Sequence, residues 1–243
     1  MRTGNCAPPP TGSLLRSTPP HPPSPHCARA AATYQVNSAP LPPPLQPCDH
    51  AALMAAGAAT GAPVLRFFIE PVVRAVTWAL RRGYARVALA GLSGGGWTTT
   101  LAAALDARLA LSVPIAGSIP CDFRHTSWDA EQFCDAAWAR AANYSTLYAL
   151  AALEAGRASV QLLHEADPCC HHGCGRHARI AEYGARVAAA TAGAFRTAVT
   201  RGNVHEVNPR DRVILAALLD AYARGAPLPP LDALPYDLMR GGS

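Results

Sequence analysis

The stretch GYARVALAGLSGGGWTTTLAAALDARLALSVPIAGSIP, residues 83–120, decides the fold class. It contains two short apolar runs, 85–90 and 109–116, that have the length of buried strands. Between them lie a glycine-rich turn and a segment of helical composition, 97–106. A strand, a tight turn, a helix and a second strand in this order form a βαβ unit, so the stretch predicts a parallel α/β sheet.

The same alternation continues on both sides of this stretch. Downstream, the apolar runs 160–163 and 194–200 predict a third and a fourth strand, and the helices predicted there are 144–154, 180–192 and 209–224. Upstream, a helix is predicted over 71–82, with Pro71 at its first position and Gly83 at its end. The long connection 118–157 is interpreted as a cap-like insertion.

The N-terminal part of the chain has a different composition. Thirteen of the 23 prolines lie in residues 1–48, and the first acidic residue is Asp49. Residues 1–47 are therefore interpreted as a disordered, proline-rich tail or a transit-like segment, and 48–243 as the folded domain. Because the tail has no apolar core of a secretory signal, a cytoplasmic or organellar location is favoured over secretion.

Composition argues against two classes of function. The net charge is +5, and all 21 basic residues are Arg, scattered along the chain instead of clustered. Nucleic-acid binding is therefore not favoured, since such proteins concentrate their cations on one face. No run of 18 apolar residues is free of charges or prolines, so we expect no transmembrane span.

Gly91-Leu92-Ser93-Gly94-Gly95 matches the pattern G-x-S-x-G between a predicted strand and a predicted helix. In such a nucleophile elbow the serine hydroxyl is exposed on a strained turn, and small residues are needed at Gly91 and Gly95. The backbone N–H of Gly94 would then serve as an oxyanion donor. The alternative is a phosphate-binding or simply tight βα turn, although no Walker Lys and no G-x-G-x-x-G pattern accompany it.

A serine nucleophile needs a histidine base and a carboxylate that orients the imidazole. Asp167 follows the third predicted strand and His205 follows the fourth, where a parallel sheet collects its active site. Ser93, Asp167 and His205 are thus the predicted catalytic residues. Glu165 remains a competing acid, and the competing bases are His164 and His177.

Residues 65–224, and 83–120 above all, resemble the α/β-hydrolase superfamily, in particular its esterase and dienelactone-hydrolase-like branches. The resemblance implies that Ser93 is the nucleophile, Asp167 the acid and His205 the base. The implied reaction is hydrolysis of a carboxylic ester through an acyl-enzyme, on a small-molecule or acylated substrate and without a cofactor.

One departure from that superfamily concerns the region before the elbow. The family places four strands there, whereas Cys48 and Tyr84 are only 36 residues apart. The chain is therefore predicted to be a partial α/β-hydrolase of about four parallel strands, with an uncovered first strand that invites self-association. The alternative function is that of a truncated or catalytically inactive relative that acts as a binding module.

The cysteines leave several alternatives open. Residues 169–177 hold six soft-metal ligands, but adjacent ligands seldom reach one zinc ion, so no metal site is predicted. Free thiols or a local disulfide are expected there, and reduced thiols are the default for the eight cysteines. In an oxidising compartment Cys121 and Cys134 would be able to pair, and the sequon at Asn143 would matter.

Overall fold

The computed structural model describes residues 50–61, 63–123, 140–169, 177–232 and 234. The chain divides into two compact units, one of residues 1–66 with 128–133 and one of residues 67–127 with 134–243. The described part of the first unit consists of helix α2, His50–Thr60, and the residues that follow it. The predicted tail, 1–47, lies outside the described residues, and the boundary proposed at residue 48 remains a prediction.

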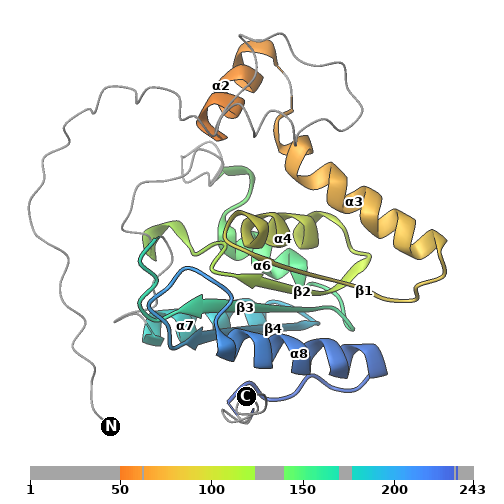
Figure 1. Ribbon diagram of the computed structural model, residues 1–243, viewed down its shortest axis with the longest axis vertical. Coiled ribbons are helices and arrows are strands. Elements are labelled where there is room, and N and C mark those ends of the chain that lie inside the picture. The colour runs from red at the N-terminus through yellow and green to blue at the C-terminus, as the bar shows by residue number, and fades with distance from the viewer. Residues whose placement is uncertain (1–49, 62, 124–139, 170–176, 233, 235–243) are drawn as a thin grey trace, which may run out of the picture. The chain divides into compact units, whose positions relative to one another are not determined.

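The second unit is built on a parallel sheet of four strands (Figure 1). The strands lie side by side in chain order, and their bounds are β1 Val87–Leu92, β2 Leu109–Ile115, β3 Ala158–His164 and β4 Ala194–Thr200. The predicted fold class, an α/β protein with four parallel strands, is confirmed. Because the strands are parallel and adjacent, all four carboxyl ends meet at one edge of the sheet.

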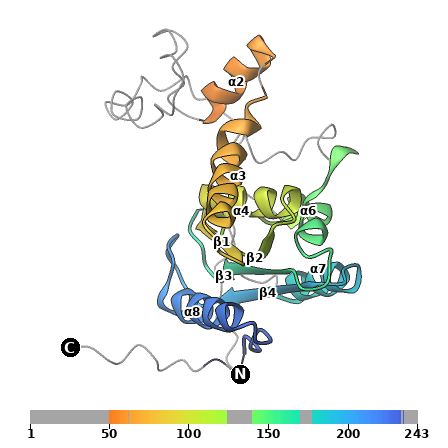
Figure 2. The same ribbon diagram turned by 90° about the vertical axis from the view of Figure 1, so that its right-hand side faces the viewer.

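Helices cover both faces of this sheet (Figure 2). Three helices, α4 Gly94–Leu105, α6 Tyr144–Ala151 and α7 His177–Ala189, form one layer, and α8 Pro209–Arg224 covers the other face. Side chains alternate between the two layers along each strand. Val113 and Val160 pack against Ile214 of α8, whereas Gln161 meets Tyr183 of α7.

The helix before the elbow differs from its prediction. Helix α3 spans Leu65–Arg81, so it begins six residues earlier than expected and contains Pro71 in its interior. Proline removes one backbone hydrogen bond and crowds the carbonyl four residues before it, but Pro71 is exposed, so water can bond that carbonyl. The apolar side of α3 outweighs this cost, since Val76 is buried and Phe68 packs edge-on against Trp97 at 5.3 Å.

The predicted cap-like insertion is described only in part. Residues 124–139 lie outside the described residues, a 3-10 turn occupies Cys121–Phe123, and α6 ends at Ala151, three residues earlier than predicted. Helix α6 contacts α4 and α7, so it belongs to the layer that covers the sheet. The cap interpretation therefore rests on residues outside those described.

A buried polar network fixes the loop that follows β2. The Tyr148 hydroxyl donates to Ser118 Oγ at 3.1 Å, and Gln161 Nε2 donates to the Ser118 carbonyl at 2.7 Å. Tyr183 donates to the Gln161 amide oxygen. Burial raises the pKa of both tyrosines, so their hydroxyls remain protonated donors. The network stabilises the loop at the edge of the sheet where the predicted site lies.

Candidate active site

Ser93 occupies a strained turn between β1 and α4. Its backbone lies at φ 55° and ψ −124°, outside the regions that residues with a side chain normally adopt. The turn is held from β2, because the Ser93 N–H donates to the Ile115 carbonyl at 2.9 Å. This strand, strained serine and helix form the geometry predicted from G-x-S-x-G.

The glycines around Ser93 meet different requirements. A Cβ on Gly91 would lie 2.3 Å from the Gly95 carbonyl oxygen, so the two backbones do approach closely, as predicted. A Cβ on Gly95 would meet nothing within 4 Å, whereas one on Gly96 would lie 2.7 Å from the Ile115 carbonyl oxygen. The close approach therefore requires glycine at positions 91 and 96, and Gly96 was not singled out from the sequence.

Gly94 is the first residue of α4. The first N–H groups of a helix have no partner within the helix, and the helix dipole favours negative charge at this end. The N–H of Gly94, directly after Ser93, is one of these groups.

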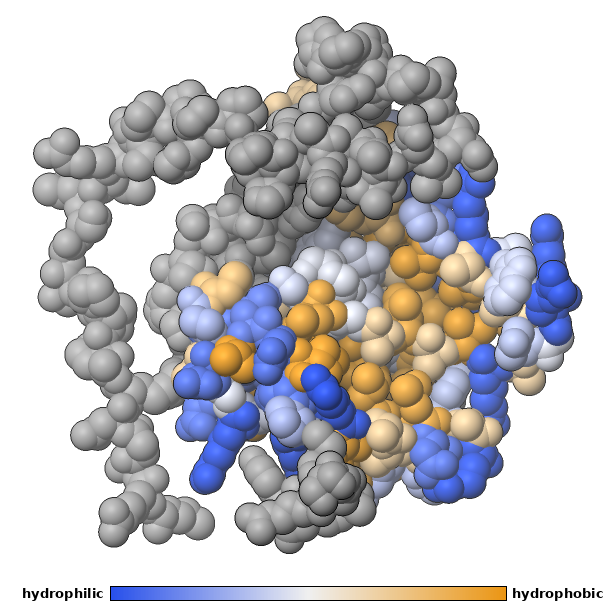
Figure 3. Space-filling model, in the orientation of Figure 1, coloured by the Kyte–Doolittle hydropathy of each residue, from blue (hydrophilic) through white to orange (hydrophobic). Residues whose placement is uncertain are grey.

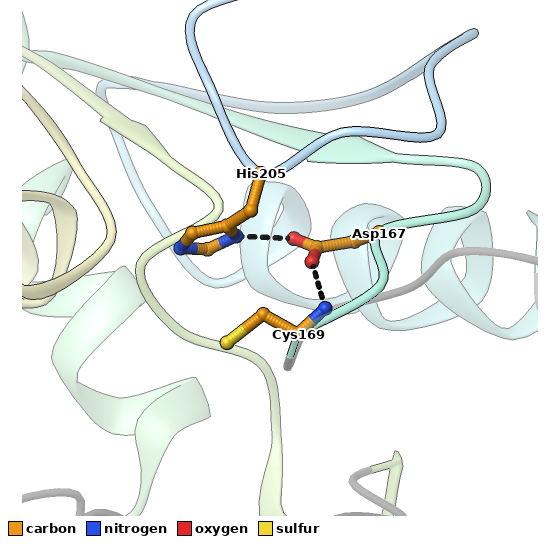
Figure 4. Close-up of side chains that lie close together, drawn as sticks. All are labelled: Asp167, Cys169 and His205. Carbon is orange, nitrogen blue, oxygen red and sulfur yellow. Dashed lines mark hydrogen bonds and ion pairs between the residues drawn. The ribbon is translucent and has the colours of Figure 1, made fainter.

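Asp167 and His205 come together where β3 and β4 end (Figure 4). The loops after these strands are joined by two backbone hydrogen bonds, from Glu165 N to the Thr200 carbonyl at 2.9 Å and from Ala166 N to the Gly202 carbonyl at 3.0 Å. The His205 Nδ1 atom lies 2.9 Å from Asp167 Oδ2. The second carboxylate oxygen accepts the N–H of Cys169 at 2.8 Å. Asp167 is therefore oriented from both sides.

The hydrogen bond between Asp167 and His205 fixes which ring nitrogen of His205 carries the proton. Asp167 is fully buried, and its carboxylate can only accept, so the neutral imidazole of His205 carries its proton on Nδ1. The lone pair is then on Nε2, which is buried and has no hydrogen-bond partner among the described residues. The structure gives no hydrogen bond between His205 and Ser93, whose side chain makes no capping bond to α4.

The competing residues occupy other positions. Asp167, not Glu165, makes the hydrogen bond to His205. His164 is fully buried and bonds Asp211 of α8 through Nε2 at 2.8 Å. His177 begins α7, and its side chain lies outside the described part of the structure.

The default of reduced thiols is wrong for the two cysteines that the structure describes. Cys121 and Cys169 are both disulfide-bonded. Disulfides of this kind persist in oxidising compartments. Cys134, Cys170 and Cys174 lie outside the described residues.

One group of side chains has the spacing of a metal site. Single ligand atoms of Asp167, Cys169 and His205 all lie within 4.8 Å of one another. However, the Cys169 sulfur is in a disulfide and is not a thiolate, and Asp167 already binds His205. Asp167 and His205 therefore form a hydrogen-bonded acid–base pair, and the three side chains do not fit a zinc site. Most of the predicted soft-ligand cluster, 170–176, lies outside the described residues.

Neither a protein-family model nor a curated protein sequence matches the chain. Solved structures do resemble it. A putative dienelactone hydrolase from Klebsiella pneumoniae is 16% identical over 63% of this chain and 56% of its own, with a TM-score of 0.40. An acetyl xylan esterase from Paenibacillus sp. R4 is 16% identical over 67% and 54%, with a TM-score of 0.47. The esterase Pf2001 of Pyrococcus furiosus is 13% identical over 66% and 60%, with a TM-score of 0.38.

The chain thus spans little more than half the length of the first two of these structures. At these identities and TM-scores the likeness concerns the fold alone. What the site can do is inferred from its own geometry.

Among the described helices, none is long and apolar enough to span a bilayer, in agreement with the sequence.

Proposed function

We propose that the protein is a serine hydrolase that cleaves a carboxylic ester through an acyl-enzyme. One observation carries the proposal: the Asp167–His205 pair leaves a buried, unpartnered Nε2 at the same edge of the sheet as the strained Ser93. A base oriented by a buried carboxylate and a serine on an elbow are the two parts that acyl transfer requires.

In the proposed reaction the Ser93 hydroxyl attacks the ester carbonyl carbon while His205 Nε2 accepts its proton. The N–H of Gly94 would donate to the oxyanion of the tetrahedral intermediate. As the intermediate collapses, His205 returns the proton to the departing alcohol and the acyl group stays on Ser93. Water, deprotonated by His205, then releases the acid. The buried Asp167 stabilises the imidazolium formed in both steps. No cofactor is required, and the substrate would be a small or acylated ester.

Labelling with a fluorophosphonate probe and turnover of a short p-nitrophenyl ester test the proposal. We expect Ser93→Ala to abolish labelling and to reduce turnover by about a thousandfold or more without changing the melting temperature. Ser145→Ala, on the outer layer helix α6, is the control and should retain both activities. A Ser93→Ala variant with unchanged turnover would remove Ser93 from the mechanism.

The two candidate acids can be separated in the same assay. Asp167→Asn should reduce turnover by about 10⁴-fold, because an amide no longer enforces the Nδ1-protonated form of His205 or stabilises its cation. Glu165→Gln is the matched control and should stay within about threefold of the native protein. The reverse pattern would assign the acid to Glu165.

A second candidate function is a non-catalytic binding module that keeps the elbow. Two observations favour it: among the described residues Ser93 and His205 are not hydrogen-bonded, and β1 pairs with β2 alone. The fluorophosphonate assay separates the two functions, because only an activated serine reacts. Absence of any label on Ser93 in the folded native chain would favour the binding module.

A further inference from the structure

The proposed mechanism does not use a second histidine that lies beside the acid. His164 is the last residue of β3, and its side chain is fully buried. One ring nitrogen, Nε2, lies 2.8 Å from Asp211 Oδ2, and the other, Nδ1, lies 4.0 Å from Asp167 Oδ2. The imidazole therefore sits between two buried carboxylates, one of which holds the proposed base.

Asp211 determines the protonation of Nε2, the nitrogen of His164 that faces α8. Its carboxylate accepts the Thr200 hydroxyl at 2.9 Å and the Asn208 N–H at 3.0 Å, within the capping box that begins the helix. Asp211 is fully buried and surrounded by donors, so it is used as an acceptor. Nε2 of His164 therefore carries a proton and donates it to Asp211.

The other ring nitrogen is left facing Asp167. Nδ1 has no hydrogen-bond partner among the described residues and is shielded from water. A neutral ring would point a lone pair at a carboxylate 4.0 Å away, whereas a protonated ring would present an N–H to it. The backbone carbonyl of Val204, next to His205, lies near the ring and acts weakly in the same direction, although it is not placed to form a full hydrogen bond with Nδ1. In the described residues, the charged groups in contact with His164 are thus the two carboxylates.

The balance of these effects favours the cation. Burial acts to lower the pKa of His164, but the hydrogen bond that His164 donates to Asp211 and the charges of Asp211 and Asp167 outweigh it and raise that pKa above its usual 6.5. Replacing one of these partners would leave an uncompensated charge in the interior.

We propose that His164 is a positioning residue, an imidazolium held between Asp211 and Asp167 that fixes the carboxylate on which His205 depends. This inference rests on the proposed function for its catalytic meaning. It joins three elements, since His164 ends β3, Asp211 lies in the first turn of α8, and Val204 precedes His205 in the loop after β4. His164 acts through Asp167 and does not itself touch the reacting atoms.

The charge on His164 has a consequence for the base. The Nδ1 atoms of His164 and His205 lie 4.0 and 2.9 Å from the same oxygen, Asp167 Oδ2. A cation at 4.0 Å stabilises the Asp167 carboxylate and holds its oxygen in place beside His205. Removing the charge should therefore weaken the Asp167–His205 hydrogen bond and slow the chemical step.

The variant His164→Gln tests this directly. A glutamine amide can donate to Asp211 as Nε2 does but cannot carry a charge. Side-chain ¹H–¹⁵N spectra of the full chain at pH 7, with His164→Gln and His205→Asn to assign the signals, report the protonation of both His164 nitrogens without any need for turnover. We expect both nitrogens of His164 to be protonated. In the ester assay, His164→Gln should lower kcat by about tenfold and leave KM unchanged.

Arg212→Gln is the matched control. It removes a cation that is exposed on the same turn of α8, where solvent screens it, and should change kcat by less than about twofold. If His164→Gln does not fold, the ¹⁵N shifts of the native protein at pH 7 decide. Two protonated nitrogens on His164 support the proposal, and a single one overturns it.

The outcomes separate this inference from the proposed function. A singly protonated His164, or an unchanged kcat in His164→Gln, with normal labelling of Ser93 would overturn the role of His164 and leave the hydrolase. A doubly protonated His164 without labelling of Ser93 would overturn the hydrolase and leave the buried imidazolium.

Discussion

At the scale of single residues, the His164 imidazole also makes the stability of the fold depend on pH. Its pKa is raised above 6.5 in the folded chain, because the hydrogen bond and charge of Asp211, together with the charge of Asp167, outweigh its burial. A raised pKa of a base stabilises the fold fully below the unfolded value and loses that effect as the pH rises through the folded value.

We therefore expect the free energy of unfolding to fall as the pH rises above about 6.5, in part because of His164. The His164→Gln variant should lose this part of the slope and be less stable than the native chain at pH 6. Urea unfolding at pH 5.5, 6.5, 7.5 and 8.5 measures both slopes. Equal slopes in the two proteins would contradict a protonated His164.

The sequence identified some of these residues and not others, for a physical reason. Ser93 has a local pattern, and Asp167 and His205 each follow a predicted strand, so chain order alone placed them at one edge. His164 was predicted only as a competing base. Its partner Asp211 lies 47 residues away, and nothing in the spacing shows that β3, β4 and α8 bring them together. For Cys169 the sequence left two alternatives open, a free thiol and a local disulfide, and the structure has the disulfide.

At the scale of elements, two helices begin with the same residue type in different surroundings. Asn208 caps α8 in a capping box with Asp211, is buried, and donates through Nδ2 to Thr200 at 2.9 Å. Asn143 caps α6 by accepting the Thr146 N–H at 2.9 Å, but it is exposed. Comparing Asn143 with Asn208 therefore distinguishes the contribution of the capping bond to stability from the contribution of the buried hydrogen bonds around it.

We expect Asn143→Ala to destabilise the protein by about 1 kcal/mol, the usual value of a cap. Asn208→Ala should cost about 2–4 kcal/mol, because it also leaves Thr200 and Asp211 with unmet hydrogen bonds in the interior. Thermal or urea unfolding measures both. Similar losses in the two variants would mean that the buried network around Asn208 adds little to the cap.

Element boundaries show where local signals fail. The strands and the helix over 209–224 were predicted well, because apolar periodicity and turn residues mark their ends. Helix α3 was predicted to begin at Pro71, since proline suits a first turn, yet packing of Phe68 and Ile69 extends it back to Leu65. Helix α2 was missed, because its alanine-rich sequence has no amphipathic pattern.

At the scale of the whole molecule, the outer edge of β1 is the feature with the clearest consequence. Among the described residues β1 pairs only with β2, and Ala90 in its middle is exposed. Figure 3 shows apolar residues gathered on the face where β1 and α3 lie in Figure 1. Phe67 and Trp78 of α3 are each 56% exposed. An apolar edge strand with unpaired N–H and C=O groups invites pairing with another chain.

We expect the full chain to self-associate in a concentration-dependent manner through this edge. Size-exclusion chromatography with light scattering measures the mass. Ala90→Lys, which places a charge on the edge strand, should shift the protein toward the monomer. Ala185→Lys is the matched control, since Ala185 is exposed on α7, away from β1, and should leave the association unchanged. A chain that is monomeric at all concentrations, or an Ala90→Lys variant that associates as the native chain does, would show that the β1 edge is not a docking surface.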